Sequence, residues 1–155
     1  MKYSTARRER GGGVASEIEI LVDSDAFVGR FYPDDKHHQT ATGIFSELEE
    51  KGSSIATTSM VVAETATVLS HRSGQDLARL FLDAIEKSTL PVIHIDEKLQ
   101  QEAITIFRRQ DKRGTSLTDC VNVAVIQRFK IQAIFSFDKF YSKRFSLRTV
   151  GKATG

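Results

Sequence analysis

The chain has 155 residues, of which 40% are hydrophobic and 27% charged, a composition typical of one compact globular domain. The sequence excludes a membrane-spanning protein, because no run approaches the roughly 20 apolar residues that cross a bilayer, and the N-terminus has no apolar secretory signal. A single cysteine, Cys120, excludes an internal disulfide and a thiolate metal cluster. We therefore expect a soluble, cytoplasmic protein without a membrane partner, and any metal site should use oxygen ligands rather than the thiolates of a zinc site.

The net charge of +2 is unevenly distributed along the chain. Residues 1–16 contain four basic residues and one acidic residue, which leaves 18 basic against 19 acidic residues in the remainder. This segment also contains three consecutive glycines and no apolar period, so we predict a disordered basic leader at 1–16 and one folded domain at 17–155. The leader is either an RNA-contacting arm or a dispensable extension.

Hydrophobic periodicity and capping residues predict strands that alternate with helices along the folded part. In its first half we expect, in order, a strand at 17–23 with an apolar run at 20–22, a helical turn at 26–31, a helix from 33–35 to about 51, a strand at 54–57, and a helix from 58 or 59 to about 71. In its second half we expect a helix at 75–87, a strand at 92–95, a helix from 96 to about 110, a loop at 112–114, a helix at 117–129, a strand at 133–137, a polar and aromatic turn, and a strand near 147–150.

This alternation predicts an α/β fold, because parallel neighbours need crossover connections and the connecting helices cover the sheet. We expect a single doubly wound, mainly parallel sheet of four to five strands with helices on both faces. Ligands of such sheets bind beyond the carboxyl ends of the strands, near the point where the strand order reverses. Polar residues at strand ends are therefore the first candidates for a site.

Two carboxylates follow predicted strands. Asp23 ends the first strand and Asp138 ends the fourth, so both project into one crevice if these strands are neighbours. The alternative for either residue is that it caps the helix behind it. Asp25 is well placed as the cap of the turn that starts at Ala26.

Two further acids lie on predicted helices. Glu64 shares a helical face with Val61 and Val68, and a carboxylate on an apolar face needs a basic partner such as Arg72, a cation, or a place at the helix margin. Asp119 stands in the first turn of an apolar helix, where capping by Thr118 or Asp119 is the structural alternative. Asn122 lies on the same face as Asp119, either as an extension of the polar spot or as a satisfied buried amide.

Together these acids can share one crevice only if something positive lies among them. Carboxylate oxygens without Cys or His ligands favour Mg²⁺ or Mn²⁺, which take the rest of their shell from waters and substrate phosphate. The pattern thus indicates phosphodiester cleavage with one or two divalent ions.

At these residues the sequence resembles the PIN-domain ribonucleases and, among them, the VapC-type toxins of toxin-antitoxin pairs. The resemblance covers almost the whole chain after residue 16 and is carried by four short motifs in the expected order, namely 20–28 (ILVDSDAFV), 61–69 (VVAETATVL), 116–120 (SLTDC) and 134–140 (IFSFDKF).

The resemblance implies a PIN-like fold and acidic catalytic residues at Asp23, Glu64, Asp119 and Asp138, with Asp23, Asp119 and Asp138 as metal ligands. It also implies a hydroxyl beside the third acid, matched by Thr118 or Ser116. At the position of Asp25 the family more often has Ser, Thr or Asn, so Asp25 and Asn122 are accessory candidates. Five basic residues near the acidic motifs are candidates for holding the RNA backbone, namely Lys112, Arg113, Lys139, Lys143 and Arg144.

Three other functions compete with a nuclease. The pair Asp23 and Asp25 is similar to the signature of haloacid-dehalogenase-type phosphatases, but Phe27 occupies the place where those enzymes have Thr or Val. A two-component receiver domain needs an acceptor Asp and a Lys that are not evident here. A non-catalytic PIN-like module that binds RNA or protein is the alternative from a different class.

The partners expected from the resemblance are an RNA substrate and a cognate antitoxin that blocks the crevice, with an arginine against the carboxylates. The apolar helices between Asp35 and Lys87 also offer a surface for a homodimer.

Overall fold

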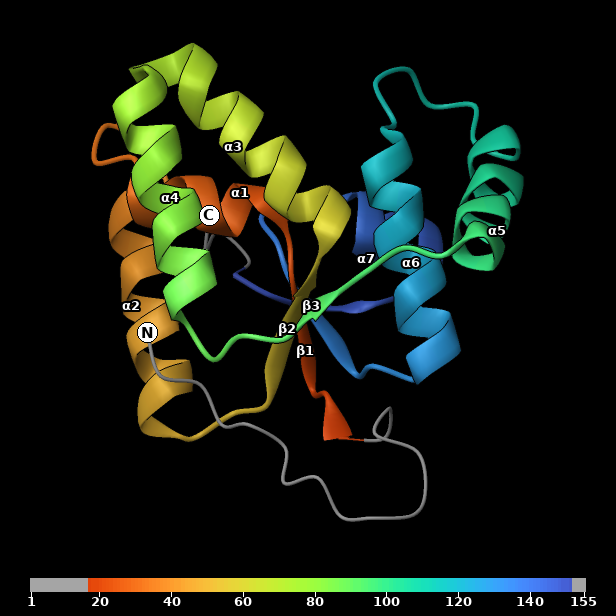
Figure 1. Cartoon of the computed structure of the whole chain (residues 1–155). Coiled ribbons are helices and arrows are strands. Elements are labelled where there is room, and N and C mark those ends of the chain that lie inside the picture. The colour runs from red at the N-terminus through yellow and green to blue at the C-terminus, as the bar shows by residue number, and fades with distance from the viewer. Residues whose placement is uncertain (1–16, 152–155) are drawn as a thin grey trace.

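The computed structural model describes residues 17–151 and contains one parallel β-sheet between two helical layers (Figure 1). The predicted leader at 1–16 lies outside the described residues, so its boundary stays a prediction. In the described part of the chain no helix is long and apolar enough to span a membrane.

The sheet has five strands, all parallel, in the order β3-β2-β1-β4-β5. The strands are β1 (Ile20–Val22), β2 (Ile55–Thr58), β3 (Val92–Ile93), β4 (Ala133–Phe135) and β5 (Arg148–Val150). β1 is central and pairs with β2 on one side and β4 on the other. The strand order therefore reverses beside β1, and the residues that follow β1 and β4 meet at the same edge, as predicted.

Four helices cover one face of the sheet: α1 (Ser24–Phe31), α2 (His38–Glu50), α3 (Ser59–Ser73) and α4 (Gln75–Lys87) (Figure 1). Their core is aromatic, with Phe27 packed between Phe45 and Phe81 at ring distances of 5.6 and 5.5 Å. Thr58 caps α3 by accepting a hydrogen bond from the backbone of Val61.

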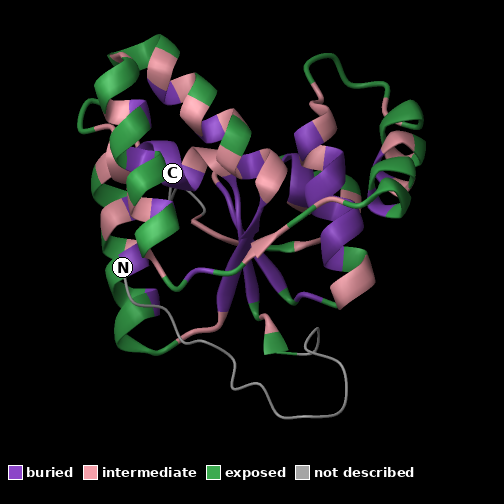
Figure 2. Cartoon of the chain, viewed as in Figure 1, coloured by how far each residue is buried: buried purple, intermediate pink, exposed green. Residues whose placement is uncertain are grey.

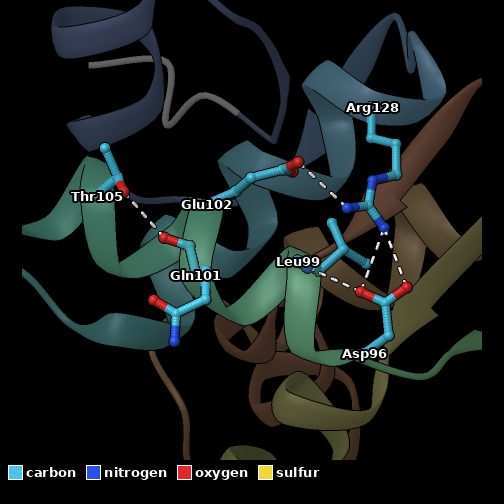
Figure 3. Close-up of polar contacts among 6 residues, drawn as sticks. All are labelled: Asp96, Leu99, Gln101, Glu102, Thr105 and Arg128. Atoms are coloured by element: carbon cyan, nitrogen blue, oxygen red, sulfur yellow. Dashed lines mark hydrogen bonds and ion pairs between the residues drawn. The ribbon is translucent and has the colours of Figure 1, made fainter.

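Three helices cover the other face: α5 (Glu97–Arg108), α6 (Leu117–Phe129) and α7 (Phe140–Phe145). α6 is buried along most of its length, as Figure 2 shows. Asp96 caps α5 at the backbone of Leu99, and Arg128 of α6 binds both Asp96 and Glu102 (Figure 3). This ion-pair cluster fixes the start of α5 against the end of α6.

The predicted elements differ from the structure in several places. β1 is shorter than the predicted strand at 17–23, and β4 ends at Phe135 rather than at 137. Residues 33–37 form turns rather than the start of a helix, because Asp35 accepts a hydrogen bond from the backbone of His37 and α2 begins only at His38. The segment predicted as a polar and aromatic turn contains α7, in which Phe140 and Tyr141 are buried. β3 has two residues rather than four because its pairing with β2 is limited to Val92 and Ile93.

Candidate functional site: a cluster of carboxylates beyond the strand ends

Asp23 lies at the centre of the cluster, directly after β1, and only 3% of it is exposed. Its Oδ1 accepts hydrogen bonds from the backbone of Ser24 (2.8 Å) and from Nδ2 of Asn122 (3.0 Å). Its Oδ2 accepts one from the Ser136 hydroxyl (2.8 Å), which follows β4. Asp23 is therefore the N-cap of α1, but it also joins β1 to α6 and to the end of β4.

Asp25 connects α1 to the turn after β4 and does not cap α1, which corrects the expectation from the sequence. Its Oδ2 accepts hydrogen bonds from the backbone of Phe137 (3.0 Å) and the hydroxyl of Ser136 (3.2 Å). The backbone of Asp138 donates to the same Ser136 hydroxyl at 3.1 Å, and Oδ1 of Asp138 accepts from the backbone of Phe140. Ser136 thus links the acids of two strand ends.

Glu64 of α3 reaches the cluster through Ser24, whose hydroxyl donates to Oε2 of Glu64 at 2.6 Å. Glu64 is half-buried and lies at the edge of the buried face of α3, because the fully buried residues of this helix are Val61, Thr65 and Leu69. The expected basic partner, Arg72, instead forms an ion pair with Asp35. The partner that the structure gives Glu64 is therefore a hydroxyl.

Asp119 is held at the start of α6 by a capping box with Ser116. The Ser116 hydroxyl accepts from the backbone of Asp119, and Oδ2 of Asp119 accepts from the backbone of Ser116. The hydroxyl that caps α6 thus belongs to Ser116 and not to Thr118. Oδ1 of Asp119 accepts from the hydroxyl of Tyr141 (3.1 Å), which in turn accepts from Nδ2 of Asn122 (3.0 Å).

Three of the carboxylates, Asp23, Asp25 and Glu64, have a raised pKa because they are buried and lie near other acids. Burial raises the pKa of Asp23 well above its ordinary value, and the charges of Asp25 and Asp119 raise it further. Burial also raises the pKa of Asp25 to about 7, with the Asp138 charge contributing, and it raises the pKa of Glu64, with the Asp119 charge contributing. These couplings connect all five acids.

None of the five acids forms an ion pair with a basic side chain within residues 17–151. Asp25 Oδ1 and Asn122 Oδ1 are buried and accept no hydrogen bond there. Uncompensated carboxylates and orphaned oxygen acceptors are the donors that a hard divalent cation takes. The donor set therefore fits Mg²⁺ or Mn²⁺ in its chemistry.

The side chains do not form a complete metal cage. Within residues 17–151, no three Asp, Glu, His or Cys side chains converge closely enough to hold an ion by themselves. Mg²⁺ is usually bound by one or two carboxylates, with waters and substrate phosphates in its remaining positions. Asp23, Asp119 and Asp138 as the metal ligands stay a prediction.

The five basic residues expected near the acids are all exposed. Two of them, Lys112 and Arg113, lie in the loop before α6, and the other three lie at the start of α7 or within it. Arg144 binds Asp111 at 2.8 Å and so connects the loop to α7. The RNA contacts of these residues stay a prediction, whereas Phe140 and Tyr141 pack in the interior and offer no face to a base.

The chain matches the model of the PIN domain over residues 20–144. It belongs to the PIN-domain family. Over 124 residues it is 30% identical to the 23S rRNA-specific endonuclease VapC20 of Mycobacterium tuberculosis, a match that spans 79% of this chain and 92% of VapC20.

Solved structures of VapC proteins have folds similar to that of this PIN domain. The crystal structure of Mycobacterium tuberculosis VapC20, a sarcin-ricin loop cleaving toxin, superimposes with a TM-score of 0.73 and 26% identity, over 80% of this chain and 93% of that one. VapBC2 from Rickettsia felis, bound to a DNA fragment from its promoter, gives a TM-score of 0.64 at 14% identity over 88% of this chain and 100% of that one. A toxin-antitoxin complex from Klebsiella pneumoniae gives 0.57 at 14% identity over 85% and 96%. The last two likenesses concern the fold alone.

Three side chains of this PIN domain that build the cluster were not predicted from the sequence. Ser24 carries a local signal, because it lies between two acids at the end of a strand. Ser136 lies within a matching motif but is not acidic. Tyr141 has no local signal, since its bonds to Asp119 and Asn122 depend on how α7 packs against α6.

Proposed function

We propose that the chain is a metal-dependent endoribonuclease and the toxin of a toxin-antitoxin pair. The observation that carries the proposal is the group of five coupled carboxylates, without a basic partner among the described residues, at the strand-order reversal of a PIN domain. The endonuclease activity of VapC20, a relative at 30% identity over most of both chains, supports the reaction class.

The proposed reaction is hydrolysis of an RNA phosphodiester bond. A water oxygen attacks phosphorus, the bond from phosphorus to the 3′ oxygen breaks, and the leaving oxygen takes a proton from solvent water. The products carry a 3′-hydroxyl and a 5′-phosphate. When bound, one or two Mg²⁺ or Mn²⁺ ions supply Lewis-acid chemistry at a phosphate oxygen and at water.

In this scheme the protein's own side chains position the ion and take up the proton of the attacking water. Asp23, Asp119 and Asp138 would hold the ion through their carboxylate oxygens, and the hydrogen-bond donors that surround Asp23 fix its orientation. Glu64 accepts the proton of the attacking water, which suits a half-buried carboxylate whose pKa is raised by burial and by the charge of Asp119. The Ser24 hydroxyl donates a hydrogen bond to Oε2 of Glu64 and thereby orients the carboxylate toward the other acids.

The proposed partners follow from the relatives. Toxin-antitoxin complexes among the structural neighbours support a cognate antitoxin that covers the carboxylates. A homodimer through the helices between Asp35 and Lys87 and a cytoplasmic location remain predictions.

The test compares cleavage of RNA by the wild-type protein, Asp23→Asn and Asp83→Asn, first on an RNA that contains the sarcin-ricin loop. Asp83 is an exposed acid on α4 and serves as the matched control. We expect EDTA to abolish cleavage, Mn²⁺ to restore it, and Asp23→Asn to lower it by at least about a hundredfold. Undiminished cleavage by Asp23→Asn, or cleavage that EDTA leaves intact, contradicts the proposal.

A further inference from the structure

A hollow of about 380 Å³ opens directly beside the carboxylates, between α1, the turn at 33–37, α3 and the turn after β4. Its lining carries charges of both signs. Three acids, Asp25, Asp35 and Asp138, and two cations, Lys36 and Arg72, line it together with Ser24 and His37. A hollow of similar size near the starts of β1 and β4 includes none of the predicted site acids.

One wall of the hollow is aromatic and rigid. The imidazole of His37 stacks on the ring of Phe137 with centroids 4.0 Å apart and planes 2° from parallel, and both rings line the hollow. The backbone of Phe137 is bound by Asp25, and the backbone of His37 is bound by Asp35. The two rings are therefore anchored to the same framework as the carboxylates.

Of the two cations in the lining, Arg72 is held by an ion pair and Lys36 is not, within the residues that the structure describes. Arg72 is held by Asp35 at 2.7 Å and lies over the ring of Tyr32, 4.7 Å from its centroid, yet 43% of its side chain is exposed. Lys36 is exposed and forms no ion pair within the described part of the chain. A ligand of this hollow should thus carry negative charge beside a flat ring.

We infer that the hollow holds one unstacked nucleotide of the RNA, adjacent to the phosphodiester that the carboxylates cleave. Its base lies against the rings of His37 and Phe137, and its phosphate faces Lys36 and Arg72. This inference rests on the proposed ribonuclease function. Single-stranded RNA is recognised by stacking on aromatic side chains combined with cationic contacts to the backbone, and the hollow offers both.

A segment of the antitoxin is the other conceivable occupant, but the walls fit it less well. Docked helices need a continuous apolar groove, whereas Val28 and Val68 are the aliphatic residues of this hollow. The remaining lining is charged, polar or aromatic, and the volume is near the lower end of the range for small-molecule sites. A single nucleotide matches both properties.

The test uses the double variant Lys36→Ala/His37→Ala and the matched control Lys98→Ala/His94→Ala, in which the same residue types are removed from exposed positions outside the hollow. Cleavage of the sarcin-ricin loop RNA is followed with Mn²⁺. We expect KM to rise about tenfold in the double variant with kcat within about twofold of wild type, and no change in the control. The affinity of the double variant for the same RNA, measured in EDTA, should also depend less on salt. The slope of the logarithm of the binding constant against the logarithm of the salt concentration should become shallower by about 0.7, as expected for one lost phosphate contact.

Two further measurements keep the inference distinct from the proposed function. Circular dichroism and thermal unfolding establish that the double variant is folded, and His37→Phe, which keeps a ring for stacking, should retain the wild-type KM. A folded double variant that cleaves with the wild-type KM overturns the inference, as does His37→Phe behaving like the alanine variant. If the double variant instead loses only its affinity for the cognate antitoxin, the hollow is a protein-docking surface. A wild-type protein that cleaves no RNA at all contradicts the proposed function.

Discussion

Tyr141 shows how much of the site depends on one buried hydroxyl. It donates to Oδ1 of Asp119 and accepts from Asn122, which also donates to Asp23. Removing the hydroxyl takes one donor from a carboxylate and leaves Asn122 with one acceptor fewer.

We expect Tyr141→Phe to lower the free energy of unfolding by about 1 to 3 kcal/mol and kcat/KM by about tenfold to a hundredfold, because Asp119 loses its orientation. Urea denaturation and cleavage kinetics measure the two effects. Tyr32→Phe is the control, since the Tyr32 hydroxyl bonds to no residue in 17–151, and it should change stability by less than about 0.5 kcal/mol. Equal effects of the two substitutions would contradict the role of Tyr141.

Asp25 predicts a pH dependence of stability. Its pKa in the folded protein is about 7, above the ordinary value of 3.8, so the folded state binds this proton more tightly than the unfolded state does. The folded state is therefore favoured by this group at low pH, and that advantage is lost as the pH rises from about 4 to about 7.

In EDTA, the wild-type free energy of unfolding should fall between about pH 4 and about pH 7, and that of Asp25→Asn should fall less because an amide does not titrate. Asp34→Asn, an exposed acid in the neighbouring turn, is the control and should follow the wild-type curve. Parallel curves for wild type and Asp25→Asn would show that Asp25 does not titrate in this range.

At the scale of elements, α1 packs tightly against α2 at Gly29. A Cβ at this position would lie 2.9 Å from Cβ of Ala41 and 3.4 Å from the backbone oxygen of His37. The Gly29 carbonyl is also bonded to Nδ1 of His38 at 2.7 Å. This contact sets the position of the turn at 33–37, which forms part of the hollow beside the carboxylates.

We expect Gly29→Ala to destabilise the protein by about 1 to 3 kcal/mol because the two helices must separate. Gly43 on α2 is a matched control, because a Cβ there meets no atom within 4 Å, and Gly43→Ala should stabilise the helix by about 0.5 to 1 kcal/mol. Chemical denaturation measures both. Stabilisation by Gly29→Ala would contradict the close packing.

The elements also show what local patterns predict and what they do not. The bounds of α4 and α6 were predicted correctly, because the apolar residues of α4 recur with helical periodicity and α6 is an apolar segment that begins directly after its capping residue, Ser116. Periodicity missed α7, since a six-residue helix owes its stability to the burial of Phe140 and Tyr141 against other segments. It also placed the start of α2 too early, because the side chain of Asp35 competes for the backbone of the turn.

At the scale of the whole molecule, the mainly parallel sheet with helices on both faces follows from the sequence, because alternating strands and helices restrict the topology. The edge at which Asp23 and Asp138 lie was predictable for the same reason. The strand order was not predicted, and the ends of β1 and β4 were expected to meet only on the condition that these strands are neighbours, which they are. The contacts that join the acids were not predictable, because Ser24 reaches Glu64 across 40 residues and Ser136 reaches Asp23 across 113. Such distant pairs depend on packing that no local pattern encodes.

Because the carboxylates of the cluster repel one another, we expect a bound divalent cation to stabilise the whole protein against unfolding. A divalent cation binds deprotonated carboxylates, so protons and the ion compete for Asp23 and its neighbours. We expect Mn²⁺ at about 100 times its dissociation constant to add about 2.7 kcal/mol to the free energy of unfolding, which raises Tm by about 5 to 10 °C for a chain of this length. The increase should be larger at about pH 8 than at about pH 5, because raised pKa values keep the carboxylates protonated in acid.

Thermal unfolding with and without Mn²⁺ measures this increase. We expect Asp23→Asn to abolish the increase and the control Asp83→Asn to retain it. An increase that is independent of pH, or unchanged in Asp23→Asn, would place the ion outside this cluster.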